Sequence, residues 1–538
     1  MYKAVKRICW ALVFLLAFAL FPAAVVRAAD ADLLEEVREL LMIYYVDELG
    51  PDVLNAKSVE EMVSRLRDPD TEYMDGETYS RFVGSIDNES ATGMVGVVIE
   101  EAPEGLLVLE VMEGYSAKAQ GISPGDVIIA VNDAPLSGMT TDESTALLRG
   151  EPGSDVNVAV RRGQETLRFT LTRSILYMPL AEGLLIDEHI GYVALNSFGM
   201  TMAEEFQAEA LRLKAEGADC WLLDLRGNTG GYTEEALDLL GFFIGNSTAM
   251  IMEESQTSES ISANRQEIAL SEPVVLLTDR YSASSSEVVS GALRDHRRAL
   301  LVGGNTSGAG KVKQIFGLSN GDYLKMTIYR FFSPQHGAID SVGIAPQLAV
   351  PDDEALNVGA LLLAGHDTVP PDVDGYIRVQ TPAGRYAFSL EDLRSETFWL
   401  AGRIILSLER DVRLERGTAA GWEYLPAGLH SHLLYYPGYR SAGILNDVPP
   451  DKVFTLSAGE QSVDWMTVTP ERVELIDAQT GRRLPYTVKE SETGMLELRP
   501  GEQLIPGADY WLVLHGLKDM SGRLLPPELA VIRASVEK

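Results

Sequence analysis

The sequence predicts a multidomain chain of the α+β class. Amino-terminal helices, a small β module with one helix, a layered α/β domain and a carboxyl-terminal β-sandwich follow one another. The chain has 538 residues, of which 46% are hydrophobic and 23% charged, enough for several cores of ordinary composition. The spacing of its apolar residues also changes along the chain, from helical to alternating, then to a mixture of both, and back to alternating.

The charge balance excludes some partners. Lys and Arg number 45 against 79 Asp and Glu, so the net charge is −34. Such an acidic surface repels phosphate backbones, and we therefore expect no nucleic-acid partner. The composition also differs from that of disordered chains and of proteins with many membrane spans.

The amino terminus has the order of parts typical of a signal peptide: a basic segment, an apolar run and a small-residue cleavage site. These parts are Lys3, Lys6 and Arg7, then residues 8–21, then Val26-Arg27-Ala28. We predict a signal peptide over residues 1–28, which makes the mature chain secreted or extracytoplasmic. If uncleaved, the same segment would be a membrane anchor.

Cysteine and histidine usage predicts neither disulfides nor metal sites. The chain has two cysteines, and Cys9 lies in the predicted signal peptide. Cys220 begins the apolar run CWLLDL, which predicts a buried strand and a packing role for the thiol. The seven histidines are scattered, without zinc-ligand spacing.

Residues 30–90 predict a helical region. Apolar residues recur three and four positions apart, which gives one apolar helix face. They are Leu33, Leu34, Val37, Leu41 and Tyr44, and then Val59, Met62, Val63 and Leu66 before Asp68-Pro69 stops the pattern.

Residues 91–173 alternate as β-strands with glycine between them, and contain one helix-like segment, TTDESTALLRG. The stretch resembles a PDZ domain in Gly121-Ile122, Gly125-Asp126-Val127-Ile128 and Asn132. This resemblance implies that a peptide carboxyl terminus is captured as an added strand at a sheet edge. It places the carboxylate-binding loop at Gly93, Met94, Val95 and Gly96. An inert spacer is the alternative role.

Residues 174–352 alternate strands and helices, which predicts an α/β layered domain. The segments CWLLDLRGN and PVVLLTD are apolar without alternation. Such strands are typical of a parallel sheet covered on both faces.

Ser284 lies between the second of these strands and a predicted helix. A serine at a helix amino terminus has free backbone N–H groups beside it, which can stabilise an oxyanion. However, Ser284-x-x-Glu287 is also a capping box. The segment alone therefore favours a helix cap.

Three motifs in order make residues 30–352 resemble the carboxyl-terminal processing peptidases of family S41. They are Asp224-Leu225-Arg226-Gly227-Asn228-Thr229-Gly230-Gly231, the segment SASSSEVVSGALRDHRRA from Ser282, and Gly343-Ile344-Ala345-Pro346. The resemblance implies that Ser284 is the nucleophile of a serine–lysine dyad and that no cofactor is needed. It implies an oxyanion hole of the Ser285 N–H and the N–H of Gly230 or Gly231.

The lysine of the dyad departs from this pattern. The family lysine is the 25th residue after the nucleophile, which is Ala309 here, and the family glutamine four residues later is Lys313. A bulge at the flanking glycines would let Lys311 act as the base. Otherwise the shift of about 6.6 Å along a strand breaks the dyad, and the protein binds peptides without cutting them. A third reading has Lys313 reach inward.

Residues 353–446 mix short helix-like and strand-like segments, and we treat them as a mixed linker region of unknown role. Residues 447–538 alternate again. They resemble the immunoglobulin-like domains of bacterial surface-layer proteins in Leu504-Ile505-Pro506-Gly507, Tyr510, Leu517-Lys518-Asp519 and Gly522. This resemblance implies a spacer or adhesion sandwich and an association with the cell wall.

Together these features predict an exported serine endopeptidase that cleaves proteins or peptides from their carboxyl-terminal tails, with the tail bound by the PDZ domain. Its partners are proteins or peptides with a free carboxyl terminus, and its oligomeric state stays open. The rival class is a peptide-binding or cell-wall scaffold without hydrolysis, because of Ala309.

Overall fold

A computed structural model describes most of the chain. The described residues are 30–89, 92–254, 257–365, 373–381, 384–408, 413–426, 431–456, 463–490 and 496–536. The predicted signal peptide lies outside them. Within them no helix is long and apolar enough to cross a membrane. The chain divides into two compact units, one of Met1–Ser80 with Lys313–Tyr329 and one of Arg81–Val312 with Arg330–Lys538.

The first unit contains the predicted helical region. Its elements are α2 (Asp30–Tyr44), α3 (Pro51–Leu54), α4 (Val59–Leu66) and β1 (Glu72–Met74), followed by the start of α5 (Gly76–Ile86). Val37, Leu41 and Met62 of the predicted apolar face are buried. Strand β1 pairs antiparallel with β16 (Tyr323–Phe332) and has too few residues to show an alternating pattern in the sequence.

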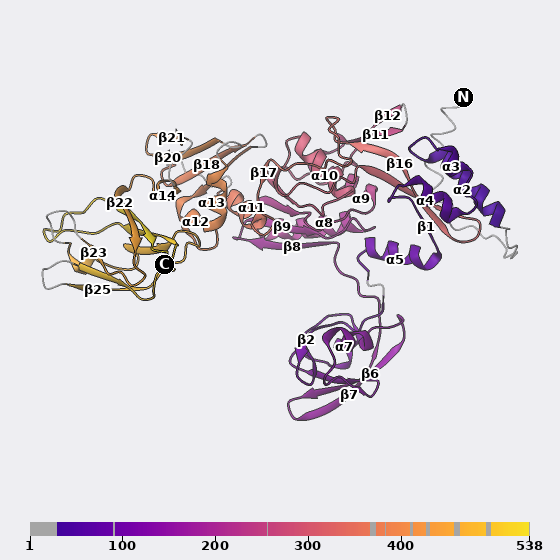
Figure 1. The fold of residues 1–538 in the computed structure, drawn as a ribbon, viewed down its shortest axis with the longest axis horizontal. Helices are drawn as coiled ribbons and strands as arrows, with labels where there is room; N and C mark the ends of the chain where they lie inside the picture. Colours follow the sequence, from indigo (N-terminus) through magenta and orange to yellow (C-terminus); the bar gives the residue numbers. More distant parts are fainter. Residues whose placement is uncertain are drawn as a thin grey trace. The chain divides into compact units, whose positions relative to one another are not determined.

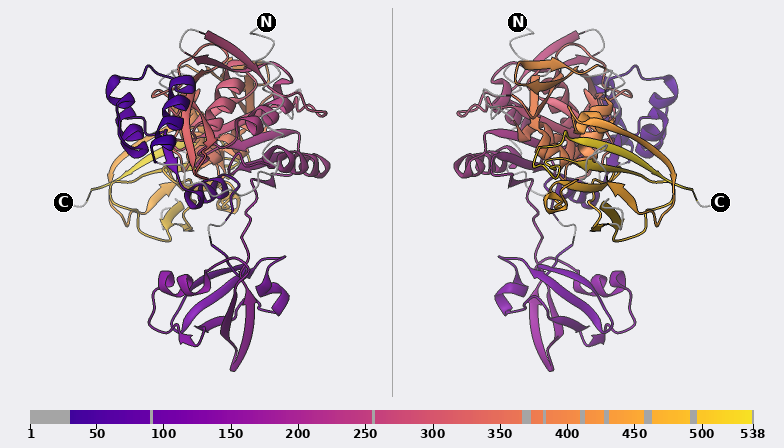
Figure 2. Two further views of the ribbon diagram at one scale, coloured as in Figure 1. Left: turned by 90° about the vertical axis from the view of Figure 1, so that its right-hand side faces the viewer. Right: turned by 90° about the vertical axis from the view of Figure 1, so that its left-hand side faces the viewer.

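Residues 97–172 form the antiparallel sheet of the predicted PDZ region, in the order β2-β3-β4-β6-β7 with β5 beside β4. The elements are β2 (Val97–Ala102), β3 (Gly105–Val111), α6 (Ser116–Gln120), β4 (Val127–Val131), β5 (Ala134–Pro135), α7 (Thr141–Leu148), β6 (Asp155–Arg162) and β7 (Glu165–Thr172). Figure 2 shows this module in purple, with its helices beside the sheet. Strand β2 is an edge strand, so one side of its backbone is open to a further strand.

A six-stranded sheet is the centre of the second unit, in the order β17-β14-β13-β10-β9-β8. Its strands are β8 (Ala181–Ile186), β9 (Ile190–Leu195), β10 (Cys220–Asp224), β13 (Val274–Thr278), β14 (Leu300–Gly303) and β17 (Leu348–Ala349). All neighbours are parallel except β8, which is antiparallel to β9. Every residue of β10 and β13 is buried, as the apolar runs predicted.

Helices cover both faces of this sheet (Figure 1). Helices α8 (Met202–Glu216), α9 (Thr233–Ile244) and α10 (Ser285–Asp295) share one core with Leu223, whereas α11 (Ala355–Ala364) shares the opposite core with Leu222. A hairpin of β11 (Thr248–Glu254) and β12 (Thr257–Ser262) lies in the same unit. Strand β15 (Lys311–Gly317) begins in this unit and continues in the first unit from Lys313. The layered α/β domain is therefore present.

The segment without a predicted role, residues 353–446, packs as a layer on the central sheet. It contains β18 (Tyr376–Thr381), β19 (Gly384–Ser389), β20 (Arg413–Thr418) and β21 (Gly421–Tyr424), with α12 (Leu390–Arg394), α13 (Trp399–Ser407) and α14 (Ser431–Tyr435). Trp399 and Tyr435 belong to the same buried cluster as Leu222 of β10. Because that cluster is continuous, we assign this layer to the body of the α/β domain.

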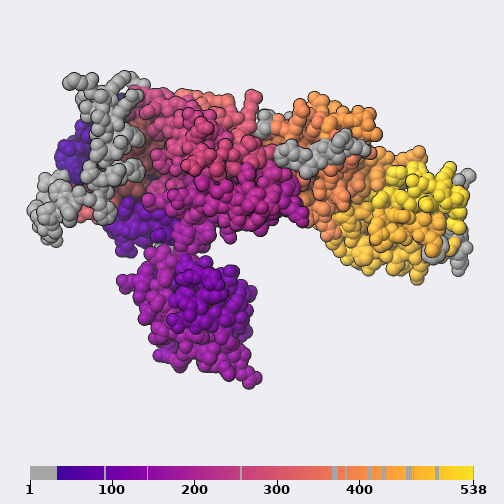
Figure 3. Space-filling model, turned by 180° about the vertical axis from the view of Figure 1, so that it is seen from behind, coloured from indigo at the N-terminus to yellow at the C-terminus, as the bar shows by residue number. Residues whose placement is uncertain are grey.

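The carboxyl-terminal residues form two sheets around one core. One sheet has the order β22-β28-β27-β24 and the other β23-β26-β25. The strands are β22 (Arg440–Val448), β23 (Phe454–Leu456), β24 (Val473–Asp477), β25 (Tyr486–Glu490), β26 (Leu496–Pro500), β27 (Asp509–Leu514) and β28 (Glu528–Ala534). This is the predicted sandwich, coloured yellow in Figure 3. Its immunoglobulin-like assignment stays a prediction.

Candidate active site

Ser284 lies where the chain passes from β13 into α10. Its backbone has φ +54° and ψ −112°, a region that residues with a side chain rarely adopt. The neighbouring residues hold it there, because the Ala283 N–H and the Ser286 hydroxyl both donate to the Asn228 carbonyl, at 3.0 and 2.8 Å. Backbone strain of this kind persists only where the surroundings impose it, and it often marks a functional residue.

The loop after β10, residues 227–231, is here called the glycine loop, and it packs directly on this serine. A Cβ atom on Gly230 would lie 2.8 Å from the Ser284 Cβ, and Gly230 has φ +101°. Both facts require glycine at this position. The Ser285 hydroxyl donates to the Gly231 carbonyl at 3.0 Å. The structure thus brings together Ser284, Ser285, Gly230 and Gly231, which the sequence placed in one site.

Two backbone N–H groups beside Ser284 have no hydrogen-bond partner among the described residues, those of Ser285 and Gly231. The Gly230 N–H donates to the Asn228 Oδ1 at 2.8 Å. An oxyanion would have to displace that bond to be bound by Gly230. In this conformation the Ser285 and Gly231 N–H groups are the available pair of donors.

Glu287 connects Ser284 at the junction of β13 and α10, here called the serine corner, to the loop that carries the family lysine position. Its side chain is fully buried, and its carboxylate accepts four hydrogen bonds. The donors are the Ser284 N–H (3.0 Å), the Ala309 N–H (2.8 Å), the Gly308 N–H (2.7 Å) and the Thr306 hydroxyl (2.6 Å). The sequence suggested Glu287 only as a capping partner of Ser284, because its other donors lie at least 19 residues away.

Ala309 occupies the position of the family lysine beside the serine corner. The Ser284 and Ala309 nitrogens share the Glu287 Oε2 as acceptor, so they lie no more than 5.8 Å apart, the sum of the two bond lengths. The Gly310 carbonyl accepts from the Phe331 N–H at 2.9 Å. Because the chain is bonded on both sides of Ala309, moving Lys311 into this position would break several hydrogen bonds.

Lys311 is the first residue of β15 and is half-buried. Val312 packs against the core that contains Val288 of α10. Since strand side chains alternate, Lys311 and Lys313 belong to the other face of β15. The Lys313 Nζ lies 3.4 Å from the Asp70 carboxylate, so the Lys313 ammonium group is part of an ion pair.

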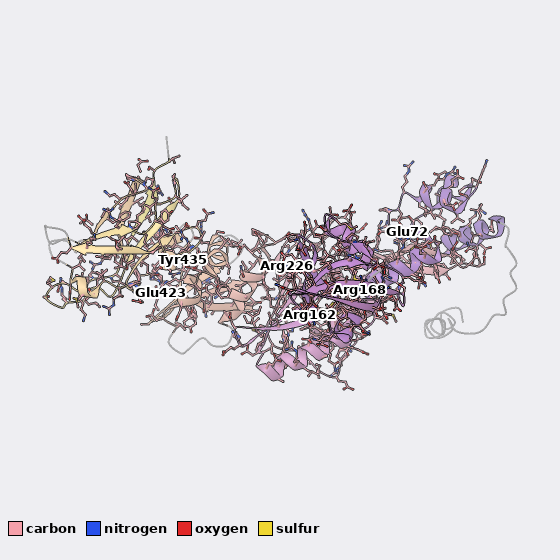
Figure 4. The ribbon with its side chains drawn as sticks, turned by 90° about the horizontal axis from the view of Figure 1, so that it is seen from below. Glu72, Arg162, Arg168, Arg226, Glu423 and Tyr435 are labelled. Carbon is pink, nitrogen blue, oxygen red and sulfur yellow. The ribbon has the colours of Figure 1, made fainter. Side chains whose placement is uncertain are left out.

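Asp224 and Arg226 form an ion pair at 2.7 Å and anchor the start of the glycine loop. Arg226, labelled in Figure 4, also donates to the Asp352 carbonyl at 2.7 Å. Hydrogen bonding to Asp224 raises the pKa of Arg226. Burial and the nearby Asp224 charge raise the pKa of Tyr192 to about 12. The ion pair with Asp224 and the bond to the Asp352 carbonyl hold Arg226 at the start of the glycine loop, so we assign this pair a positioning role.

The predicted carboxylate-binding loop leads into edge strand β2. The Gly93 and Met94 N–H groups are bonded to the Gly150 and Ser174 carbonyls, at 2.7 and 2.8 Å. The N–H groups of Val95 and Gly96 have no hydrogen-bond partner in the described part of the chain. Of the four predicted residues, these two have donors available for a carboxylate.

Comparison with known proteins gives two family matches. The model of peptidase family S41 matches residues 189–350, and the PDZ domain model matches residues 85–161. The glycine loop, Ser284, Glu287 and Ala309 all lie within the first match.

Curated relatives include carboxyl-terminal processing enzymes. Carboxyl-terminal-processing peptidase 2, chloroplastic, of Arabidopsis thaliana is 31% identical over 320 residues, which cover 55% of this chain and 62% of the relative. The carboxyl-terminal-processing protease of Synechocystis is 32% identical over 302 residues, covering 54% of this chain and 70% of the relative. The solved photosystem II D1 C-terminal processing protease has a TM-score of 0.40 at 24% identity, covering 61% of this chain and 94% of that chain.

Proposed function

This chain belongs to the carboxyl-terminal-processing peptidases of family S41, and we propose that it is an exported serine endopeptidase that cleaves proteins at their carboxyl-terminal tails. The observation that carries this proposal is the corner at Ser284. The serine is strained, begins a helix and has Gly230 packed against it. Beside it lie two N–H groups that have no partner among the described residues, an arrangement suited to acyl transfer.

In the proposed reaction the Ser284 Oγ attacks the peptide carbonyl carbon, and its proton passes to an uncharged Lys311 Nζ. The N–H groups of Ser285 and Gly231 bind the oxyanion. When the peptide bond breaks, the leaving amine takes the proton back from Lys311, and an acyl-enzyme remains. The same lysine then activates the water that releases the acyl group. Lys311 must be uncharged at the start, which requires desolvation when substrate binds.

The PDZ domain would supply the tail. An extended peptide added to the open edge of β2 would bring its terminal carboxylate to the Val95 and Gly96 N–H groups. Export would rest on the predicted signal peptide, and the carboxyl-terminal sandwich would act as a spacer or as the cell-wall contact.

A second candidate function is tail binding without hydrolysis, and Ala309 favours it. The bond from the Ala309 N–H to Glu287 fixes residue 309 beside Ser284. Because this residue is alanine, the position carries a methyl group instead of an amine. Lys311 starts two residues further along the chain, at about 6.6 Å in an extended strand. That distance is comparable to the full reach of a lysine side chain.

Cleavage of an unstructured protein with an apolar carboxyl-terminal tail, followed by mass spectrometry, separates the two functions. We expect the mature chain to cleave and both Ser284→Ala and Lys311→Ala to lose cleavage. Lys313→Ala is the matched control. It removes the ion pair with Asp70 and should still cleave the substrate. Bound tail without cleavage by the unaltered chain would establish the second function, and Ala309→Lys should then introduce cleavage.

A further inference from the structure

Three potential metal ligands meet at one end of the central sheet, where β9 and β10 begin. His189 precedes β9, and Asp219 and Cys220 stand where β10 begins. The His189 Nδ1 lies 3.1 Å from the Asp219 Oδ1 and 3.8 Å from the Cys220 Sγ, and the three donor atoms all lie within 4.8 Å of one another. The Asp219 N–H donates to the His189 carbonyl at 2.9 Å, which fixes the two backbones that carry these groups.

We propose that His189, Asp219 and Cys220 form a binding site for a zinc-like divalent metal ion. With these separations, a point equidistant from the three atoms lies about 2.0–2.4 Å from each, close to zinc's bond lengths to nitrogen, oxygen and sulfur. One thiolate, one imidazole and one carboxylate suit zinc or cobalt(II) rather than calcium or magnesium. Binding deprotonates Cys220 and releases that proton to solvent.

Burial supports the same arrangement. Cys220 has no exposed surface, whereas the Asp219 side chain is 52% and the His189 side chain 21% exposed. The sulfur thus lies in the interior, and the two other ligands lie nearer the surface. A water molecule can complete a tetrahedral site from that side.

The position of the site indicates a structural role. Cys220 begins β10, and the glycine loop beside Ser284 follows the other end of that strand. Metal binding would join the starts of β9 and β10 and would leave the serine corner unchanged. The expected effect is a higher unfolding temperature at an unchanged rate of peptide cleavage.

Cobalt(II) titration of the metal-free mature chain tests the proposal. A thiolate–cobalt charge-transfer band in the near ultraviolet can arise only from Cys220, because the other cysteine, Cys9, lies in the predicted signal peptide. We expect this band, its displacement by zinc, and its loss in Cys220→Ser. His189→Ala and Asp219→Asn retain the thiol and should weaken cobalt affinity at least tenfold.

The matched control is His336→Ala, since His336 pairs with Glu253 at 2.8 Å. It should leave the titration unchanged. The proposal is overturned if the folded mature chain shows no thiolate band at saturating cobalt, or if His189→Ala and Asp219→Asn bind as the unaltered chain does. Cleavage activity does not enter this test, so its result is independent of the proposed peptidase function.

Discussion

Replacing Glu287 by glutamine should open the serine corner and the loop around Ala309 together. The glutamine has nearly the same shape, but one carboxylate oxygen becomes an NH₂ group that cannot accept a hydrogen bond. Two of the four donors that now point at the carboxylate would lose their acceptor. The Glu287 side chain has no exposed surface, and its four hydrogen bonds are buried or partly buried, so water can replace the lost acceptor only in part.

The cost follows from those two donors. A fully buried donor without a partner costs about 1–3 kcal/mol, and most of these donors are only partly buried. Glu287→Gln should therefore destabilise this region by an amount in the lower half of about 2–6 kcal/mol. The total stability of a domain is only about 5–15 kcal/mol. We therefore expect local opening and slower reaction at Ser284 rather than a small local adjustment.

Hydrogen exchange followed by mass spectrometry measures this opening in peptides that cover residues 284–290 and 304–312. Exchange in both should accelerate together in Glu287→Gln. The matched control is Glu143→Gln, because Glu143 accepts the Thr140 N–H at 2.8 Å in an exposed capping box at the start of α7. Unchanged exchange in both peptides of Glu287→Gln would refute the role assigned to this carboxylate.

Three further predictions address other parts of the chain. Gly230→Ala should abolish reaction of Ser284 with serine-directed reagents while tail binding persists, because its Cβ would lie 2.8 Å from the Ser284 Cβ; equal reactivity would contradict the packing described. Trp399→Ala should destabilise the second unit by about 3–5 kcal/mol in urea unfolding, since Trp399 is fully buried in the core shared with the central sheet; a loss below about 1 kcal/mol would mean that the layer is not part of that core. Burial alone would raise the pKa of Asp126, but hydrogen bonds from Arg162 and Ser123 lower it below the ordinary value of an aspartate. Its stabilising contribution is therefore complete above that value and is lost as the pH falls through the lower folded-state pKa, so hydrogen exchange in β4 should accelerate there. Asp126→Asn should remove this acid dependence, and a variant that keeps it would place its origin elsewhere.

The parts of the fold that the sequence predicts well are those with local signals. The apolar runs of β10 and β13 are buried on both faces as expected, and Ser284 stands at the strand-to-helix corner where the sequence placed it. The two sheets at the carboxyl terminus follow from simple alternation.

The parts that it does not predict depend on residues far apart in the chain. Glu287 meets Thr306 and Ala309 only through the fold. His189 lies 30 residues before Asp219, so the cluster with Cys220 has no spacing signal. Residues 353–446 show no pattern because their large side chains pack against distant strands, as Trp399 does against Trp511, with ring centroids 5.2 Å apart.

The relation between Ala309 and Lys311 is the central chemical question. Glu287 fixes the main chain at Ala309, and the base of the proposed dyad must come from a lysine two residues away. A general base contributes about 10²–10⁴-fold to such a reaction. The rate of covalent modification at Ser284 therefore reports directly on whether Lys311 acts on this serine.

The most direct test is labelling of the mature chain with a fluorophosphonate, read by intact mass and peptide mapping. We predict one adduct, on Ser284, no adduct in Ser284→Ala, and labelling at least 100-fold slower in Lys311→Ala than in Lys313→Ala. No adduct on the folded chain, an adduct on another serine, or equal labelling rates for the two lysine variants would contradict a Ser284–Lys311 peptidase.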